Sequence, residues 1–168
     1  MAITGPESTG KSKLAEQLAK HFNTVWVPEF SREYLRELNR SYRYDDILSI
    51  AKGQFEDEER MAAKATGLLF CDTDFIVNKI WCIDKFGKCH PWILDMIDQQ
   101  HYDLYLLCNT DLPWEPDPLR ENPEDRERLF GLYKTELEER KLPYSIISGT
   151  GKERLENAIR VVDVHYKP

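Results

Sequence analysis

A glycine-rich loop that ends in lysine and serine lies almost at the start of the chain. Residues 5–12 read Gly-Pro-Glu-Ser-Thr-Gly-Lys-Ser, which is a complete G-x-x-x-x-G-K-[ST] phosphate-binding loop. Gly5 and Gly10 permit backbone angles that turn successive N–H groups inward around a phosphate. Lys11 supplies a charge for the β- and γ-phosphates as a catalytic residue, and the Ser12 hydroxyl can ligate Mg²⁺. The loop predicts binding of a nucleoside triphosphate by Gly5, Glu7, Ser8, Thr9, Gly10, Lys11 and Ser12.

Two acidic residues follow an apolar run in the middle of the chain. Asp72 and Asp74 come just after residues 68–71, which have the composition of a buried strand. A carboxylate at the end of such a strand can complete the Mg²⁺ environment of a phosphate loop, so Asp72 is a candidate catalytic and metal-binding residue. Asp74 could reach a substrate hydroxyl as a catalytic or substrate-binding group. Either residue could instead only cap the helix expected to begin near Phe75.

A carboxylate and an arginine follow the preceding apolar run. Pro28 ends the run at residues 24–27, and Glu29 emerges just beyond it. Glu29 could orient or deprotonate an attacking hydroxyl, as carboxylates do in kinases that act on small molecules. Arg32, one turn further on, could hold substrate or phosphate. The alternative is an ordinary first turn of a helix, in which acidic residues complement the helix dipole.

A proline-rich segment at residues 111–121 interrupts the alternation of strands and helices. It has three prolines in eleven residues, which exclude a helix or an interior strand. We therefore expect residues 111–128 to form a lid that closes over the site. A lid arginine could stabilise the transferring phosphoryl group, and Arg120 and Arg126 are the candidate catalytic residues. Arg128 is more easily explained by pairing on a helix surface.

Aromatic and glycine residues extend the candidate site. Trp81 and Trp114 could stack on a flat aromatic substrate, although the default role of any tryptophan is core packing. Gly149 and Gly151 follow the apolar run at residues 144–147, where the chain could pass close to the adenine ring of ATP. A turn into the last helix would have the same composition.

Short apolar runs alternate with longer helical patterns along the chain. This alternation predicts an α/β fold with a five-stranded parallel sheet and helices on both faces, and ligands of such sheets bind beyond the carboxyl ends of the strands. The predicted strands are residues 1–4, 24–27, 68–71, 103–108 and 144–147. The predicted helices are residues 11–22, 29–40, 45–65, 74–86, 91–100, 123–140 and 151–164. Asn122 is expected to cap the sixth helix, with Pro123 as its first residue.

Length, charge and composition limit the classes of protein and partner. The 168 residues fit a single domain over 1–168, and no apolar run approaches the roughly 20 residues of a membrane span. The net charge of −7 argues against a nucleic-acid partner. The four cysteines show no C-x-x-C spacing and no signal peptide is visible, so we expect a cytoplasmic protein with reduced thiols. Nothing in the sequence indicates an oligomeric state.

The motifs favour a small-molecule kinase over other proteins with a phosphate loop. A regulatory GTPase would show Asp-x-x-Gly after the third strand, whereas Asp72 is followed by Thr-Asp-Phe. A remodelling ATPase would end that strand in Asp-Glu and carry a helical second domain, and the sequence shows neither. A non-catalytic switch that depends on a nucleoside triphosphate would not need Glu29, Asp74 and Arg120.

The chain resembles the bacterial ribosylnicotinamide kinases over nearly its whole length. The resemblance rests on residues 5–12, 27–34, 72–75, 102–107 and 111–120, of which the last two are far more specific than a phosphate loop. It implies the P-loop fold of nucleoside and nucleotide kinases, with strand order 2-3-1-4-5. It also implies transfer of a phosphoryl group from MgATP to the 5′-hydroxyl of nicotinamide riboside, giving nicotinamide mononucleotide. The positively charged ring of that nucleoside would favour aromatic and acidic neighbours.

Other acceptors stay open at this point. A kinase for another nucleoside or small metabolite would share every motif except the aromatic and acidic pocket. Relatives can carry an upstream adenylyltransferase or DNA-binding domain, and this sequence has no counterpart of either. We therefore expect the chain to perform only the kinase step, unless it is part of a longer protein.

Overall fold

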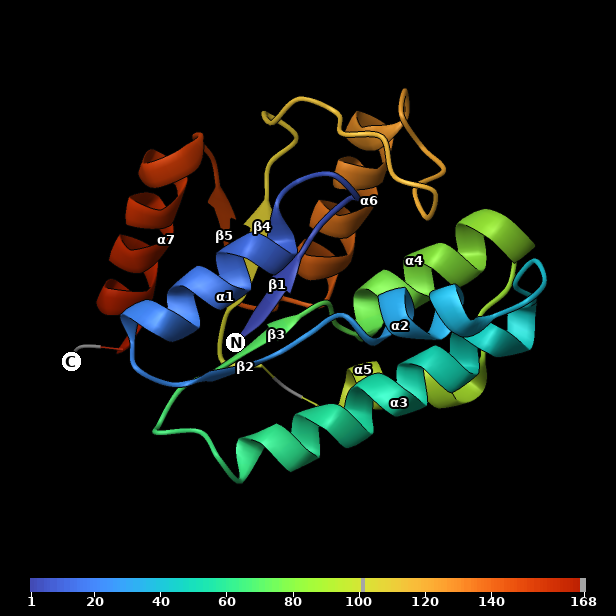
Figure 1. Cartoon of the computed structure of the whole chain (residues 1–168), viewed down its shortest axis with the longest axis horizontal. Helices are drawn as coiled ribbons and strands as arrows, with labels where there is room; N and C mark the ends of the chain where they lie inside the picture. Colours follow the sequence, from blue (N-terminus) through green and yellow to red (C-terminus); the bar gives the residue numbers. More distant parts are fainter. Residues whose placement is uncertain (101, 167–168) are drawn as a thin grey trace.

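A computed structural model describes residues 1–100 and 102–166 of the chain. Within them, five parallel strands form one sheet in the order β2-β3-β1-β4-β5 (Figure 1), which confirms the predicted fold and strand order. The strands are β1 (Ala2–Thr4), β2 (Val25–Val27), β3 (Leu69–Asp72), β4 (Tyr105–Cys108) and β5 (Tyr144–Ile147). The strand that leads into the phosphate loop, β1, is therefore central, with β3 on one side and β4 on the other.

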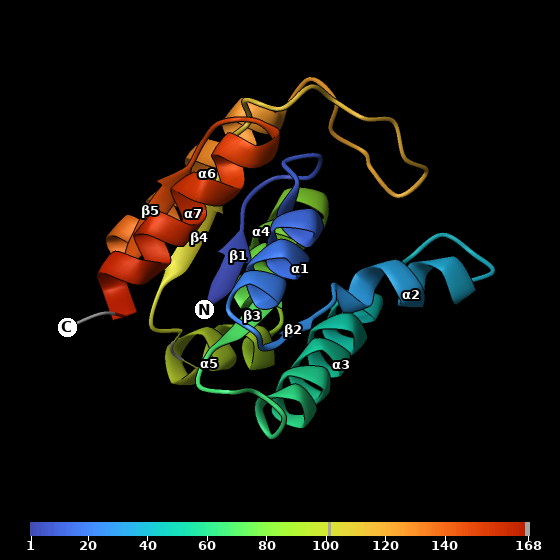
Figure 2. The same cartoon turned by 60° about the vertical axis from the view of Figure 1, so that its left-hand side comes forward.

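Helices cover both faces of the sheet (Figures 1 and 2). They are α1 (Lys11–His21), α2 (Phe30–Glu37), α3 (Tyr44–Ala62), α4 (Phe75–Phe86), α5 (Pro91–Gln99), α6 (Arg126–Glu139) and α7 (Gly151–Tyr166). Successive residues of a strand point to opposite faces. Ile3 therefore packs with α1 and α7, whereas its neighbour Ala2 packs in the core formed with α3, α4, α5 and α6. Among the helices of the described residues, none has the length and apolar character needed to cross a membrane.

Glycines let the phosphate loop leave β1 in close contact with β4. Gly5 has a φ of +124°, and a Cβ there would lie 2.9 Å from the carbonyl oxygen of Cys108. Gly10, the N-cap of α1, has a φ of +77°. A side chain at either position would strain the turn. The loop thus ends where α1 begins at Lys11, and the positive end of this helix is available to an anion held by the loop.

The sixth helix begins later than predicted. α6 starts at Arg126 with Asp125 as its N-cap, so the prediction that Asn122 caps a helix beginning at Pro123 is wrong. The backbone N–H of Asn122 instead donates to the carboxylate of Glu7 in the phosphate loop. A contact between the lid and the loop has therefore overridden a local capping signal. The other predicted elements agree with the structure within a few residues.

Candidate functional site

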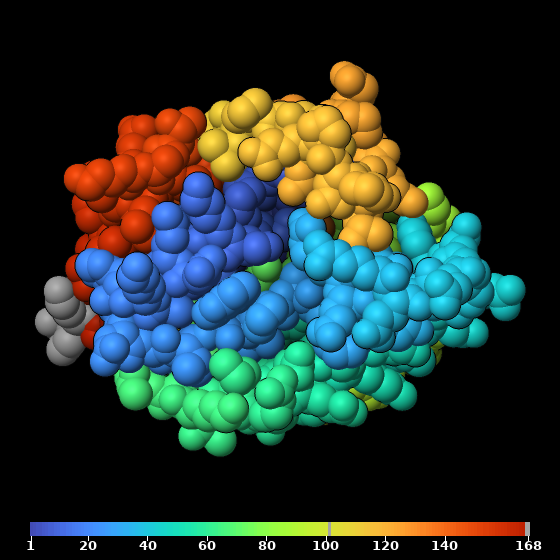
Figure 3. Space-filling view, viewed as in Figure 1, coloured from blue at the N-terminus to red at the C-terminus, as the bar shows by residue number. Residues whose placement is uncertain are grey.

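A cavity of about 690 Å³ lies over the phosphate loop, and we call it the loop cavity. Figure 3 shows the hollow between the lid segment, in yellow and orange, and the blue start of the chain. Most of the predicted ATP-binding residues line it, namely Glu7, Ser8, Thr9, Gly10, Lys11, Ser12 and Gly151. Because the loop N–H groups and the N-terminal end of α1 meet here, the cavity suits a polyphosphate.

A second cavity of about 430 Å³, the adjoining cavity, shares a wall with the first. Gly5 lines this cavity rather than the loop cavity. The residues common to both are Glu7, Lys11, Glu29 and Leu119. Two hollows that share a lysine and a carboxylate can bring a phosphoryl donor and an acceptor side by side.

The loop is held in shape by its own side chains. Thr9 Oγ1 donates to the carbonyl oxygen of Pro6 at 2.7 Å. Lys11 Nζ donates to the same oxygen at 2.8 Å, which holds the ammonium across the loop. An ammonium can donate further hydrogen bonds, so Lys11 can still bind phosphate oxygens.

Asp72 is fully buried at the end of β3, 0% exposed. Among the described residues, neither of its carboxylate oxygens has a hydrogen-bond partner. Burial, and then the negative charge of Glu29, raise the pKa of Asp72, while the charge of Lys11 and the hydroxyl of Ser12 act in the opposite direction. A buried carboxylate with unused oxygens close to Ser12 fits the Mg²⁺ site predicted for these two residues.

The described residues offer few carboxylate, imidazole or thiolate ligands for a metal ion at this place. The described part of the chain contains no group of three or more His, Cys, Asp or Glu residues that could hold a metal ion. Mg²⁺ usually keeps several waters and binds through one or two carboxylates together with substrate phosphates. The pair of Ser12 and Asp72 therefore matches a magnesium ion that arrives with a nucleotide.

Asp74 lies outside both cavities, in contrast to the prediction that it binds substrate. Its Oδ1 accepts hydrogen bonds from the N–H groups of Ile76 at 2.6 Å and Val77 at 3.1 Å, so Asp74 is the N-cap of α4. The residue is 1% exposed, and burial raises its pKa. Between the two acids, Thr73 has a φ of 90°, a strained value for a β-branched residue. The helix-capping alternative is thus the one observed for Asp74.

Glu29 lies on the wall between the two cavities. Its carboxylate accepts hydrogen bonds from Ser31 Oγ at 2.7 Å and from Arg32 Nε at 3.1 Å. Arg32 lines the loop cavity and also donates to Asp117 of the lid at 3.2 Å. Both residues therefore line the loop cavity, and Arg32 connects the carboxylate to the lid.

The lid is hydrogen-bonded to the phosphate loop along its length. The carboxylate of Glu7 accepts the N–H groups of Glu121, at 3.0 Å, and of Asn122. The hydroxyl of Ser8 accepts the N–H of Glu115 at 2.9 Å. Glu7 and Ser8 of the phosphate loop therefore hold the lid against the loop.

The two predicted lid arginines both reach Ser8. Arg120 donates to Ser8 Oγ at 3.3 Å and lines the loop cavity. Arg126 donates to the carbonyl oxygens of Ser8 at 3.2 Å and Leu112 at 2.9 Å, and lines neither cavity. The Trp114 ring lies between them, 5.9 Å from Arg120 Cζ and 5.8 Å from Arg126 Cζ, and also lines neither cavity. Arg120 is thus placed to meet a phosphate, whereas Arg126 joins the phosphate loop to the lid and Trp114 lies against both arginines. The roles of Arg126 in catalysis and of Trp114 in substrate binding stay predictions.

Trp81 and Tyr42 form an aromatic wall of the adjoining cavity. Their ring centroids are 5.0 Å apart with an interplanar angle of 67°, and Trp81 Nε1 donates to the Tyr42 hydroxyl at 3.1 Å. The Tyr42 hydroxyl donates to Glu121 Oε2 at 2.8 Å, and Lys85 Nζ binds the same oxygen at 2.9 Å. Trp81 was expected here. Tyr42 and Glu121 were missed because each lies in a loop without a spacing signal.

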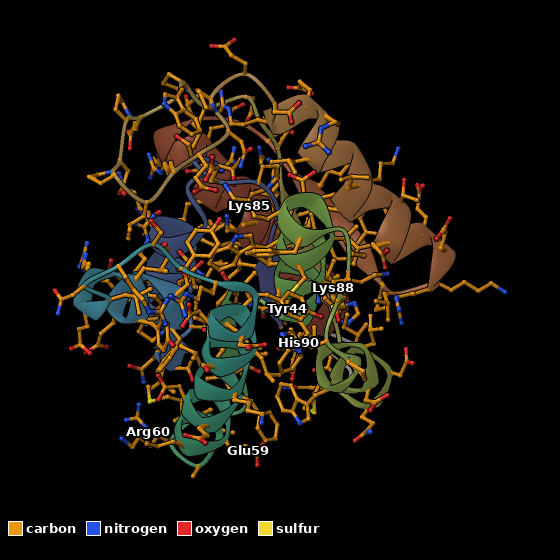
Figure 4. The ribbon with its side chains drawn as sticks, turned by 90° about the vertical axis from the view of Figure 1, so that its right-hand side faces the viewer. Tyr44, Glu59, Arg60, Lys85, Lys88 and His90 are labelled. Carbon is orange, nitrogen blue, oxygen red and sulfur yellow. The ribbon has the colours of Figure 1, made fainter. Side chains whose placement is uncertain are left out.

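More aromatic residues pack behind this wall. The Phe86 ring centroid lies 6.2 Å from that of Tyr42 and 5.7 Å from that of Tyr44. The Tyr44 ring stacks on His90 at 3.7 Å, with Lys88 Nζ 4.4 Å from its centroid (Figure 4). The loop that carries Tyr42 is therefore fixed against the end of α4 and the start of α5.

An arginine of α7 binds the turn on the other side of the loop cavity. Arg154, 4% exposed, donates to Asp111 Oδ1 at 2.7 Å and to the carbonyl oxygen of Thr9 at 2.8 Å. The N–H of Gly149 donates to Asp111 Oδ2 at 2.6 Å. Gly151 and Arg154 line the loop cavity, but Gly149 does not. The sequence gives no signal for the pair of Arg154 and Asp111, since only the fold brings them together.

The chain is similar to known proteins that have a role in NAD biosynthesis. A family model described as an AAA domain matches residues 1–154. The trifunctional NAD biosynthesis/regulator protein NadR of Escherichia coli (strain K12) is 33% identical over 150 residues, which cover 86% of this chain and 37% of that protein. The protein of the same name from Salmonella typhimurium is 32% identical with the same coverage. The chain thus spans little more than a third of the length of these relatives.

Solved structures with the same fold include nucleoside kinases. A crystal structure of NadR protein in complex with NR has a TM-score of 0.85 at 25% identity, covering 98% of this chain and 50% of that one. A NadR structure in complex with NAD and AMP-PNP has a TM-score of 0.79 at 24% identity, covering 98% and 48%. A deoxyadenosine kinase from M. mycoides, at 11% identity and a TM-score of 0.65, shares the fold over 97% of this chain and 98% of its own.

Proposed function

This chain belongs to the family described as an AAA domain, whose model matches residues 1–154, and we propose that it is an ATP-dependent kinase that phosphorylates the 5′-hydroxyl of nicotinamide riboside. The observation that carries this proposal is the meeting of two cavities at Lys11 and Glu29. The similarity to NadR over most of the chain, and the likeness to the NadR structure in complex with NR, support the choice of acceptor. The product is nicotinamide mononucleotide.

The loop cavity receives ATP. The N–H groups of the phosphate loop and the ammonium of Lys11 bind its phosphates, and the base extends toward the turn at Gly151 and Arg154. Ser12 and Asp72, together with the phosphates, would hold Mg²⁺, which would supply positive charge where negative charge develops. Arg120 adds a further positive charge from the lid.

The adjoining cavity receives the nucleoside. A pyridinium ring carries a positive charge, which is attracted to the faces of aromatic rings and to carboxylates. Trp81 and Tyr42 supply the aromatic surface, and Glu29 and Asp84 supply carboxylates within the same cavity. Asp84 is paired with Arg128 at 2.8 Å and lines only this cavity, whereas Glu29 lines both.

Transfer takes place at the shared wall. Glu29 accepts the proton of the 5′-hydroxyl as its oxygen bonds to the γ-phosphorus, and the bond from that phosphorus to the bridging oxygen of ADP breaks. Lys11 stays in contact with the transferring group throughout. Closure of the lid excludes water, so that the nucleoside is phosphorylated in preference to hydrolysis of ATP.

We infer that the partners of this protein are small molecules rather than macromolecules. The net charge of −7 supports an acceptor that is not a nucleic acid. The four cysteines are free thiols in the structure, in keeping with a cytoplasmic enzyme that needs no membrane.

The test is ATP consumption with Mg²⁺ across a panel of nucleosides, with the product identified by mass spectrometry. We expect nicotinamide riboside to stimulate ADP release more than the other nucleosides, and Lys11→Ala to lower the rate at least about 100-fold. Lys20→Ala, at an exposed position near the end of α1, is the control that keeps the wild-type rate. Strong stimulation by a different nucleoside alone would contradict the acceptor but keep the kinase. No stimulation by any nucleoside, with Lys11→Ala unchanged, would contradict both.

A further inference from the structure

The N-terminal end of α2 is capped by a side chain from α3. Phe30 is the first residue of α2, where a backbone N–H has no partner within the helix. This N–H donates to Gln54 Oε1 at 3.0 Å, and Gln54 is 2% exposed. The preceding residue, Glu29, does not cap α2, because Ser31 and Arg32 hold its carboxylate. Gln54 takes over the capping, which leaves the carboxylate of Glu29 directed at the two cavities.

The surroundings of Gln54 fix the orientation of its amide. Its Nε2 lies 3.4 Å from Glu58 Oε1, on the side opposite Phe30. A backbone N–H can only donate, so only Oε1 of the amide can face Phe30. Glu58 in turn accepts hydrogen bonds from the Tyr102 hydroxyl at 2.8 Å and from Gln100 Nε2 at 2.7 Å. The start of α2 is thereby anchored to a buried polar network.

A glycine next to Gln54 adds a steric contact to the same residue. A Cβ on Gly53 would lie 2.3 Å from Cε1 and Cζ of Phe30, so the ring occupies the space that any side chain would need. Glycine is unfavourable inside a helix, and Gly53 lies within the 19 residues of α3. Its presence is explained by this close approach of Phe30. Backbone and ring of Phe30 are therefore both held by α3.

We propose that Gln54, assisted by Gly53, is a positioning residue that sets the direction of Glu29 for proton transfer. The inference rests on the role of Glu29 in the proposed function. Phe30 follows Glu29 directly, so a shift of the Phe30 backbone moves the carboxylate relative to the bound hydroxyl. Misplacement of a catalytic group by about 1 Å can cost up to about 100-fold in rate. Gln54 itself lines neither cavity and so acts through Glu29.

The first experiment compares Gln54→Leu with Ile50→Val in steady-state kinetics. Leucine keeps most of the volume of Gln54 but cannot accept the Phe30 N–H. Ile50→Val is a small truncation at a buried position of the same helix, and controls for lost packing. We expect Gln54→Leu to lower kcat roughly tenfold without changing KM for ATP, and Ile50→Val to keep kcat within about twofold. Equal losses of kcat in the two variants would overturn the proposal.

The second experiment combines Gln54→Leu with Glu29→Gln. If Gln54 acts through Glu29, the double variant is no slower than Glu29→Gln alone, because there is no longer a carboxylate to position. Losses that multiply would overturn the proposal. A Glu29→Gln variant as fast as the wild type would show that Glu29 has no role in transfer, and would overturn the positioning with it.

A measurement made without substrate tests the role of Gln54 independently of which nucleoside is the acceptor. We expect the amide hydrogen of Phe30 to exchange about tenfold faster in Gln54→Leu, measured by NMR. In the double variant Gln54→Glu and Glu58→Gln, the acceptor for Phe30 and the net charge are both retained, so slow exchange and most of kcat should return. Unchanged exchange in Gln54→Leu would overturn the proposal. If another nucleoside proves to be the acceptor, the kinetics are measured with that nucleoside.

Discussion

Arg154 and Asp111 form an ion pair of 2.7 Å that joins α7 to the start of the lid segment. The same guanidinium binds the carbonyl oxygens of Thr9, at 2.8 Å, and Asn109, at 3.0 Å. Its side chain is 5% exposed, so it has exchanged its hydration for these oxygens. One side chain therefore sets the distance between the phosphate loop, the end of β4 and the start of the lid.

Replacing Arg154 should damage both stability and nucleotide binding. Arg154→Met leaves the Asp111 carboxylate and several carbonyl oxygens without their partner, and we expect a loss of about 3 kcal/mol in the free energy of unfolding. KM for ATP should rise more than KM for the acceptor, because Arg154 lines only the loop cavity. Urea unfolding and steady-state kinetics measure the two effects. Arg160→Met, at an exposed site of the same helix, is the control. Equal stability of the two variants would contradict this account.

Glu58 should make stability fall as the pH rises. Burial raises the pKa of Glu58 from 4.5 to about 7 in the folded protein. The folded chain therefore holds a proton that the unfolded chain has lost between these pH values, and its stability falls by about 3 kcal/mol across them. The contribution of the Glu58 proton to the free energy of unfolding is complete below about pH 4.5 and is lost as the pH passes 7.

The variant Glu58→Gln tests whether Glu58 makes the stability fall as the pH rises. It carries no charge at any pH, so urea unfolding should give a flatter pH dependence and higher stability than the wild type at pH 8. At pH 5 the wild type should be at least as stable, because the amide loses one acceptor for Gln100. Glu59→Gln, at an exposed position of the same helix (Figure 4), should leave the wild-type dependence unchanged. A wild type whose stability rises from pH 5 to pH 8 would disprove the assignment.

Glu7 should control how tightly the lid closes. Its carboxylate accepts two backbone N–H groups of the lid, from Glu121 and Asn122. Glu7→Ala removes both acceptors, so we expect the amides of residues 115–122 to exchange about tenfold faster, as measured by hydrogen exchange with mass spectrometry. Glu124→Ala, at an exposed position of the lid, is the matched control. Equal protection in the two variants would show that other contacts close the lid.

The features that the sequence predicted best are those whose signal lies within a single segment of the chain. Lys11 and Ser12 lie within a single loop motif, and the buried strands are apolar along their length, so loop, sheet and the place of Asp72 could be predicted. Asp74 could not be assigned, because an acidic residue between a strand and a helix is a good cap and a good ligand alike. The contact of Arg126 with the Leu112 carbonyl oxygen could not be predicted, because the sequence does not show which way a lid side chain points.

Tyr42 should set the affinity for the acceptor and leave that for ATP unchanged. It lines only the adjoining cavity, where its ring packs on Trp81 and its hydroxyl binds Glu121. Tyr42→Ala removes the aromatic surface, and we expect KM for the nucleoside to rise about tenfold, because an aromatic contact contributes about 1 kcal/mol beyond burial. Tyr42→Phe keeps the ring and should raise this KM less than about threefold. If KM for ATP rose equally in Tyr42→Ala, the two cavities would not be separate donor and acceptor sites.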